Sequence, residues 1–315
     1  VSVKKMPEYC VTGGTGLIAA YIVKMLLEKG HTVRATVRNP EDLEKVGFLW
    51  QMNGAKERLK LVKADLLVKG SFNDAVEGAD GVFHAASPEY LIKPCVEGVA
   101  NLLKSCSKAS TVKRVVLTSS CSSIRYRDDV QNISPLNESH FSDLEYCQRN
   151  NLWYPYAKTL AEREAWLLAE KYNIDLVVVN SSFVVGPFIT PEPTSTLLVI
   201  LAIVKGLLEE YPNQRLGFVH IDDVVNGHIL AMEDDRASGR LIVSSSVAHW
   251  SEIIEMLKAK YPSYRYASKC STKEGENNPH SMDCSKIIQL GIPGFKTIPQ
   301  MFDDCIQRFQ EKGLL

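Results

Sequence analysis

The sequence lacks any run of apolar residues long enough to cross a membrane. Its longest run extends from Leu197 to Val204, far short of the roughly 20 residues that a membrane-spanning helix needs. An excess of charge of one sign is also absent, because 36 Lys and Arg residues face 37 Asp and Glu residues and leave a formal charge of -1. Since no basic field would attract a polyanion, we expect neither a membrane span nor a nucleic-acid partner.

The cysteines also lack a pattern. All eight are scattered along the chain without a C-x-x-C pair. Disulfide frameworks and zinc sites need paired or regularly spaced cysteines. This distribution predicts reduced thiols, no metal site and a location in the cytoplasm.

What the sequence does contain is enough apolar material for a large core. The chain has 315 residues, of which 45% are hydrophobic and 23% are charged. Its first half alternates short β-branched runs with amphipathic stretches, which predicts a doubly wound parallel α/β fold. Strands are expected near residues 9–12, 32–37, 59–62, 81–84, 114–118 and 176–179, and helices near residues 17–28, 41–52, 72–76, 96–108 and 156–171.

The pattern changes after Ser182 into loops that contain Pro187, Pro191 and Pro193. We therefore predict a Rossmann-type dinucleotide-binding domain over residues 6–182. A smaller lobe over residues 183–315 is expected to bind the substrate and to return some strands to the first sheet. Such a lobe would cover the carboxyl edge of the sheet, where open α/β folds bind ligands. Residues 299–312 read as a final helix-turn-helix-like segment.

A glycine-rich turn follows the first expected strand, in Val11-Thr-Gly-Gly-Thr-Gly-Leu-Ile-Ala19. Small residues there let the backbone approach a pyrophosphate, and the following helix offers N–H groups and positive potential. The alternative is an ordinary turn, which the strand-turn-helix context disfavours. The predicted contacts to the cofactor are made by Gly13, Thr15, Gly16, Leu17 and Ile18.

The end of the second strand favours NADP(H) over NAD. No carboxylate stands there to bind a ribose 2'-hydroxyl, whereas Arg38 is present and Lys45 follows seven residues later. The alternative is that both are solvated surface cations. Asp65 and Leu66 come directly after the third strand and are also predicted to contact the cofactor. The carboxylate of Asp65 is placed either to accept a hydrogen bond from the adenine amino group or to cap a turn.

Tyr154 and Lys158 are one helical turn apart, and Pro155 suits the first turn of that helix. An ammonium near a phenol favours the phenolate, so this pair predicts proton exchange. Tyr-x-x-x-Lys alone is common, but Ser119 and Ser120 end the fifth strand at the same sheet edge. The hydroxyl of Ser120 is predicted to polarise a substrate carbonyl there.

The glycine turn, the Thr-Ser-Ser strand end and the Tyr/Lys helix, in this order, resemble an extended short-chain dehydrogenase/reductase. Further segments resemble the plant dihydroflavonol reductase and cinnamoyl-CoA reductase-like enzymes, namely residues 33–40, 54–59, 63–66, 81–84, 120–127, 246–251 and 278–283. The resemblance implies an NADPH-dependent carbonyl reductase in which Ser120 and Tyr154 hold the carbonyl, Tyr154 donates the proton and Lys158 binds the ribose. It also implies cofactor contacts from Ala85, Ala86, Ser87, Ser182 and Phe183, with Pro187 nearby.

The resemblance further implies the substrate, a hydrophobic ketone on the side chain of a tetraketide α-pyrone in sporopollenin precursor synthesis. It also implies that the protein associates with other enzymes of the pathway and is located at the cytosolic face of the endoplasmic reticulum. The alternative is a cinnamoyl-CoA, an aromatic aldehyde or a dihydroflavonol, but Pro155 and Ala157 depart from the cinnamoyl-CoA reductase pattern. Residues 197–201 are either a wall of the pocket or a buried helix face.

Other interpretations remain open. A catalytically inactive dinucleotide sensor is disfavoured by the intact Ser120, Tyr154 and Lys158. A sugar-nucleotide epimerase, which normally keeps NAD bound, is disfavoured by Arg38 and Lys45. His220 either touches a ligand or ends a strand that runs into a helix capped by Asp222 or Asp223. The connection at residues 88–89 is shorter than in the family, which predicts residues missing from the numbering.

Overall fold

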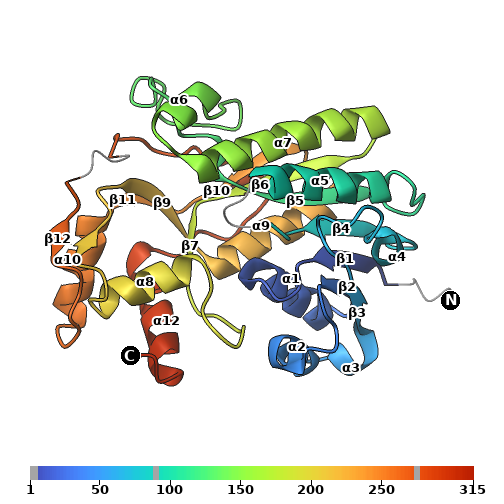
Figure 1. Cartoon of the computed structure of the whole chain (residues 1–315), viewed down its shortest axis with the longest axis horizontal. Coiled ribbons are helices and arrows are strands. Elements are labelled where there is room, and N and C mark those ends of the chain that lie inside the picture. The colour runs from blue at the N-terminus through green and yellow to red at the C-terminus, as the bar shows by residue number, and fades with distance from the viewer. Residues whose placement is uncertain (1–5, 88–91, 273–276) are drawn as a thin grey trace.

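The computed structural model describes residues 6–87, 92–272 and 277–315, and it confirms the doubly wound α/β fold. Within these residues, seven strands form one sheet in the order β10-β6-β5-β4-β1-β2-β3, and every neighbouring pair is parallel (Figure 1). The connection at residues 88–89 lies outside the described residues. The strands are β1 (Glu8–Thr12), β2 (Thr32–Val37), β3 (Leu59–Lys63), β4 (Gly81–His84), β5 (Arg114–Ser120), β6 (Leu176–Ser181) and β10 (Gly239–Val243).

Helices cover both faces of this sheet. Helices α5 and α7 pack together on one face and α1 and α9 on the other (Figure 1). Strand β1 shows how the sequence serves both layers, because Cys10 is buried under α5 and α7, whereas Tyr9 and Val11 are buried with α1. These helices are α1 (Leu17–Glu28), α5 (Ile92–Cys106), α7 (Trp153–Tyr172) and α9 (Ile221–Glu233), with the short α2 (Leu43–Trp50), α3 (Ala55–Arg58), α4 (Asn73–Val76) and α6 (Leu144–Arg149) beside them.

The strand order reverses between β1 and β4. The chain moves outward from β1 to β2 and β3 on one side, and from β4 to β5 and β6 on the other. A crevice forms at the carboxyl ends of the strands where such a reversal occurs, because the loops leave in opposite directions. Thr12 and His84 are paired in register at this point.

The C-terminal part of the chain forms two small sheets beside the main one. One contains β11 (Ser246–His249), β9 (Arg215–His220) and β7 (Phe183–Val185), and the other pairs β12 (Lys269–Cys270) with β8 (Glu210–Tyr211). Four aromatic rings in edge-to-face contact, those of Phe183, Phe218, Trp250 and Phe302, join these elements. The helices here are α8 (Thr196–Val204), α10 (Trp250–Lys260), α11 (Ser285–Gln289) and α12 (Ile298–Glu311).

The helix-turn-helix expected over residues 299–312 is wrong, because one helix, α12, occupies this segment. Thr297 caps it through a capping box, and the apolar side chains Met301, Phe302, Ile306 and Phe309 follow at helical spacing and are all buried. A single continuous buried stripe leaves no place for a turn.

No helix in the described ranges is long and apolar enough to cross a membrane. The cysteines are free thiols, and all except Cys270 are buried.

Candidate active site

A cleft of about 570 Å³ opens at the carboxyl edge of the main sheet. Its walls come from the β1-α1 turn, the ends of β4, β5 and β6, the start of α7, and the C-terminal elements β7, α8 and β9. Residues that the sequence motifs singled out are brought together here from segments far apart in the chain. They are Thr15, Gly16, Leu17, Ile18, Ala85, Ser87, Ser120, Tyr154, Lys158, Ser182 and Phe183.

The glycine turn is built for close approach. Gly13 has a φ of 71°, and a Cβ there would lie 2.9 Å from the Cα of Ala86, so neither the backbone conformation nor the space admits a side chain. Gly16 caps helix α1 without any side-chain hydrogen bond to the first-turn N–H groups. Because the first turn of α1 lines the cleft, these N–H groups and the helix dipole suit an anionic ligand such as a pyrophosphate.

Ser120 and Tyr154 enter the cleft from β5 and α7. Ser120 is the last residue of β5, and its hydroxyl accepts a hydrogen bond from the N–H of Ser122 at 3.1 Å. That bond uses a lone pair of the oxygen, so the hydroxyl proton can be donated to a ligand. Tyr154 lies in the first turn of α7 with 39% of its surface exposed. Pro155 shares that turn, where a missing N–H costs no intrahelical hydrogen bond.

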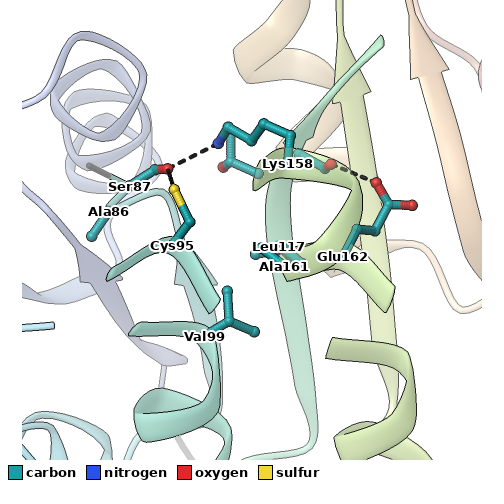
Figure 2. A pocket seen from close by; sticks show the side chains of 10 residues that line it. Ala86, Ser87, Cys95, Val99, Leu117, Lys158, Ala161 and Glu162 are labelled. Carbon is teal, nitrogen blue, oxygen red and sulfur yellow. Dashed lines mark hydrogen bonds between the residues drawn. The ribbon is translucent and has the colours of Figure 1, made fainter. Parts of the chain in front are cut away.

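Lys158 lies one turn further along α7. Its Nζ is 5.9 Å from the centroid of the Tyr154 ring and donates a 3.0 Å hydrogen bond to the Oγ of Ser87 (Figure 2). Beside it is a cavity of about 20 Å³ lined by both Lys158 and Glu162. Lys158 therefore bridges the predicted catalytic helix and the β4 loop predicted to hold the cofactor.

A buried polar network lies behind the cleft, and the sequence reasoning missed it. The carboxylate of Glu162 accepts from Ser119, from Ser123 at 2.7 Å and from Asn180 at 2.9 Å. Its other oxygen is 2.5 Å from the Nε of Arg240, and both side chains are at most 5% exposed. The hydroxyl proton of Ser119 is thus used within the network, whereas that of Ser120 can be donated into the cleft.

His84, the last residue of β4, is buried beneath the loop that follows this strand at residues 85–87. Its Nδ1 is hydrogen-bonded to the hydroxyl of Thr12 at 2.7 Å, and the same hydroxyl accepts from the N–H of Ala86 at 3.1 Å. Complete burial, with a smaller effect from the cationic Lys158, lowers the pKa of His84 from 6.5 to about 3. The imidazole is therefore neutral and holds the loop in place through Thr12.

Six predicted cofactor residues do not line the cleft. Gly13 and Ala86 lie against each other at the glycine turn beside it, and the other four are Arg38, Lys45, Asp65 and Leu66. Arg38 is exposed at the end of β2, and Lys45, whose side chain is 74% exposed, forms a 3.2 Å ion pair with Asp42. Asp65 accepts from the N–H of Leu67 at 2.8 Å, which is the turn-capping role left open for it. Leu66 packs against Gly98 of α5. The cofactor roles of these residues stay predictions.

The sequence reasoning did not assign several residues on the substrate side of the cleft. Arg125, Tyr126, Gln214 and Leu216 line it. The family-like segment over residues 120–127 was the one available signal for Arg125 and Tyr126. Of residues 197–201, Val199 lines the cleft, Leu197 and Ile200 are buried, and Leu198 is 51% exposed. The segment therefore gives one residue to the pocket wall and two to a buried helix face.

His220 ends β9 directly before α9, as one of its two interpretations stated, but the expected capping by Asp222 or Asp223 is wrong. The cap is His220 itself, whose Nδ1 accepts from the N–H of Asp222 at 3.0 Å. Its Nε2 lies 2.7 Å from where a Cβ of Gly186 would be, which explains the glycine in that loop. The carbonyl of Pro187, the next residue of the loop, accepts a hydrogen bond from the hydroxyl of Tyr21 on α1 at 3.0 Å.

Comparison with known proteins agrees with this geometry. Residues 9–243 match the model of the NAD dependent epimerase/dehydratase family. The chain belongs to this family. It is 65% identical to tetraketide alpha-pyrone reductase 2 of Arabidopsis thaliana over 98% of this chain and 100% of the relative. It is 39% identical to cinnamoyl-CoA reductase CAD2 of Medicago truncatula, over 96% of this chain and 95% of the relative.

Among solved structures, vestitone reductase from alfalfa has a TM-score of 0.84 and 36% identity, with 98% of this chain and 99% of that chain covered. The expected kinship with plant reductases of the dihydroflavonol and cinnamoyl-CoA type is confirmed. The likeness extends over nearly the whole chain, the C-terminal lobe included.

Proposed function

We propose that this protein is an NADPH-dependent reductase of the side-chain ketone of tetraketide α-pyrones. The observation that carries the proposal is the meeting of Ser120, Tyr154 and Lys158 in one cleft beside the N-terminus of α1. The high identity to an enzyme named for this reaction supports the choice of substrate. The cleft also presents the apolar side chains of Val184, Val199 and Leu216 to an alkyl chain.

The residues present fit a dinucleotide. The first turn of α1 offers uncapped N–H groups to the pyrophosphate, and Gly13 lets the β4 loop approach to within contact distance. Lys158 and Ser87 would hold the nicotinamide ribose, and Ser182 and Phe183 would line the nicotinamide side. Arg38 would bind the 2'-phosphate from the end of β2, where no carboxylate stands. When bound, NADPH supplies the hydride.

The chain's own residues would then handle the substrate oxygen. The hydroxyl of Ser120 donates a hydrogen bond to the ketone and polarises it. Tyr154 transfers its phenolic proton to the oxygen as negative charge develops there. The Lys158 ammonium stabilises the phenolate that remains, from its place one turn along the same helix. The apolar walls keep water away from the reacting carbon.

The test is NADPH oxidation with purified enzyme. The panel contains alkyl α-pyrone ketones of increasing chain length, a dihydroflavonol, a hydroxycinnamoyl-CoA and an aromatic aldehyde. Each buried CH₂ contributes up to about 0.8 kcal/mol, so kcat/KM should rise with chain length until the cleft is full. Preference for the thioester, or no dependence on chain length, supports the cinnamoyl-CoA alternative, which the 39% identity to such an enzyme keeps in view.

The wider setting is also proposed. Reduction of a pyrone ketone fits the synthesis of sporopollenin precursors, and the free, mostly buried thiols fit a reducing cytoplasm. A place at the cytosolic face of the endoplasmic reticulum and association with other pathway enzymes complete the proposal. Fractionation of the native tissue and co-purification of the tagged protein test these points, and recovery of the enzyme alone in the soluble fraction contradicts both.

A further inference from the structure

Two cationic side chains line the cleft. Among the lining residues that the structure describes, Lys158 and Arg125 are cationic and none is a carboxylate. Lys158 is engaged with Ser87 and lies beside Tyr154, on the side predicted to hold the ribose. Arg125 has no assigned task in the reaction, although it is a cation with only 8% of its surface exposed.

The position of Arg125 is fixed relative to Ser120. A 3₁₀ turn over Cys121–Ser123 follows Ser120 directly, and the N–H groups of Ile124 and Arg125 both donate to the carbonyl of Cys121, at 3.0 and 3.2 Å. The Oγ of Ser123 is also 2.8 Å from the carbonyl oxygen of Ser120, so the two ends of the turn are in contact. The hydroxyl that is to hold the ketone and the guanidinium therefore belong to one short, rigid segment.

The side chain of Arg125 is also held. Its guanidinium lies over the ring of Tyr126, 3.9 Å from the centroid, and donates to the hydroxyl of that tyrosine. The side chain of Gln214, which also lines the cleft, donates to the same hydroxyl at 3.5 Å. Such pre-organisation reduces the side-chain entropy that a ligand contact costs.

The proposed substrate carries a matching group. Closing a tetraketide into an α-pyrone leaves an enolic hydroxyl at ring position 4, conjugated with the lactone carbonyl, and places the remaining ketone on the side chain. This hydroxyl is a vinylogous carboxylic acid and loses its proton near neutral pH. The ring is therefore an anionic head, while the alkyl chain is apolar.

We propose that Arg125 binds the ionised 4-oxygen of the pyrone ring and so selects an anionic head group for the cleft. This inference rests on the proposed function, because it assigns the substrate group read at that same site. The guanidinium then fixes the ring while Ser120, on the same segment, receives the side-chain ketone. The enzyme would then select its substrates by the negative charge of the ring at one end and by the length of the alkyl chain at the other.

The experiment compares one ketone in two forms, the free 4-hydroxypyrone and its 4-methyl ether, which has no ionisable oxygen. The complete enzyme with NADPH should prefer the free form by about 10- to 100-fold in kcat/KM, mainly through KM, because a charge-assisted hydrogen bond is lost in the ether. Arg125→Gln should bring this ratio close to one. Arg125→Lys, which keeps the charge but not the planar fork, should give an intermediate ratio.

The matched control is Arg127→Gln. Arg127 lies two residues further along, pairs with Asp129 at 2.5 Å and does not line the cleft, so this variant should keep the wild-type ratio. A wild type that treats the two pyrones alike, or an Arg125→Gln variant that keeps the wild-type ratio, overturns the proposal. Because the ratio of the two kcat/KM values is taken within each variant, a general loss of activity or of folded protein cancels from the comparison.

A binding measurement separates this inference from the proposed function. A 4-hydroxy-6-alkyl-α-pyrone without the side-chain ketone cannot be reduced, so its calorimetric affinity for the enzyme with NADP⁺ needs no turnover. Tight binding that Arg125→Gln weakens by about 10- to 100-fold supports the inference even if no pyrone ketone is reduced. Equal affinity in the two proteins overturns it even if the ketone is a good substrate.

Discussion

Tyr154 and Tyr156 lie two residues apart on α7, but only Tyr154 lines the cleft. Because Tyr154→Phe removes one proton donor and no other group, kcat should fall by about 10²- to 10⁴-fold. The affinity for NADPH, measured by fluorescence titration, should hardly change. Tyr156→Phe is the matched control, since the hydroxyl of Tyr156 accepts from Gln148 outside the cleft lining. Ordinary turnover by Tyr154→Phe would show that another group donates the proton.

Arg38 tests the cofactor assignment at a single side chain. Arg38→Ala removes a fork that can grip a 2'-phosphate at two points, so the preference for NADPH over NADH should shrink by about 1 to 3 kcal/mol. The quantity to measure is the ratio of kcat/KM for the two cofactors. Arg236→Ala removes the same charge from an exposed pair with Asp234 and should leave that ratio unchanged. Equal use of both cofactors by the wild type contradicts the assignment.

At the scale of elements, the pair of Glu162 and Arg240 joins α7 to β10. Neither side chain is more than 5% exposed, so removing the carboxylate leaves the Arg240 guanidinium buried without its counter-charge. Glu162→Gln should therefore lower the free energy of unfolding by about 3 to 5 kcal/mol in urea titrations. Since Ser119 and Ser123 are bonded to the same carboxylate, the end of β5 should loosen and kcat should fall as well.

The control for this prediction is an exposed ion pair elsewhere in the chain. Arg149 and Asp128 are 2.7 Å apart with side chains that are 60% and 71% exposed. Arg149→Gln should cost at most about 1 kcal/mol, because water replaces the lost partner. An equally small loss in Glu162→Gln would mean that solvent reaches the buried pair.

The same pair shows where sequence reasoning stops. Strand ends and helix starts of the first half were predictable because each motif is local: a glycine turn, a Thr-Ser-Ser end and a Tyr/Lys spacing. Arg240 acts on Glu162 across 78 positions of sequence, and no local pattern encodes that contact. Arg125 was missed for a related reason. The sequence does not distinguish a surface arginine from one buried at a cleft, because its burial depends on contacts that form only in the folded chain, such as those with Tyr126 and Gln214.

At the scale of the whole molecule, folding encloses several histidines in their neutral form. His228 is buried between α9 and β5, where Nδ1 is 2.7 Å from the carbonyl of Val224 and Nε2 is 2.8 Å from the hydroxyl of Thr118. Nδ1 must carry the proton to donate to that carbonyl, so Nε2 accepts from Thr118. Protonation of Nε2 would turn it into a donor and reverse the hydrogen bond to Thr118, with a positive charge buried between the helix and the sheet.

This burial predicts how stability depends on pH. Desolvation lowers the pKa of His228 from 6.5 to about 4, so below pH 6.5 the unfolded chain binds a proton that the folded chain refuses. The stabilisation is complete above pH 6.5 and is lost as the pH falls toward 4, with a slope of up to about 1.4 kcal/mol per pH unit for each such group. His84 and His280, with pKa values lowered to about 3 and about 4 by burial, act in the same direction.

His228→Gln should reduce the slope of the unfolding free energy between pH 5 and pH 6 by about 1.4 kcal/mol per unit, as measured by urea titration. The difference between the two proteins at pH 8 gives the packing cost of the substitution, because the imidazole is neutral there in both states. An unchanged slope would show that His228 is protonated in the folded protein.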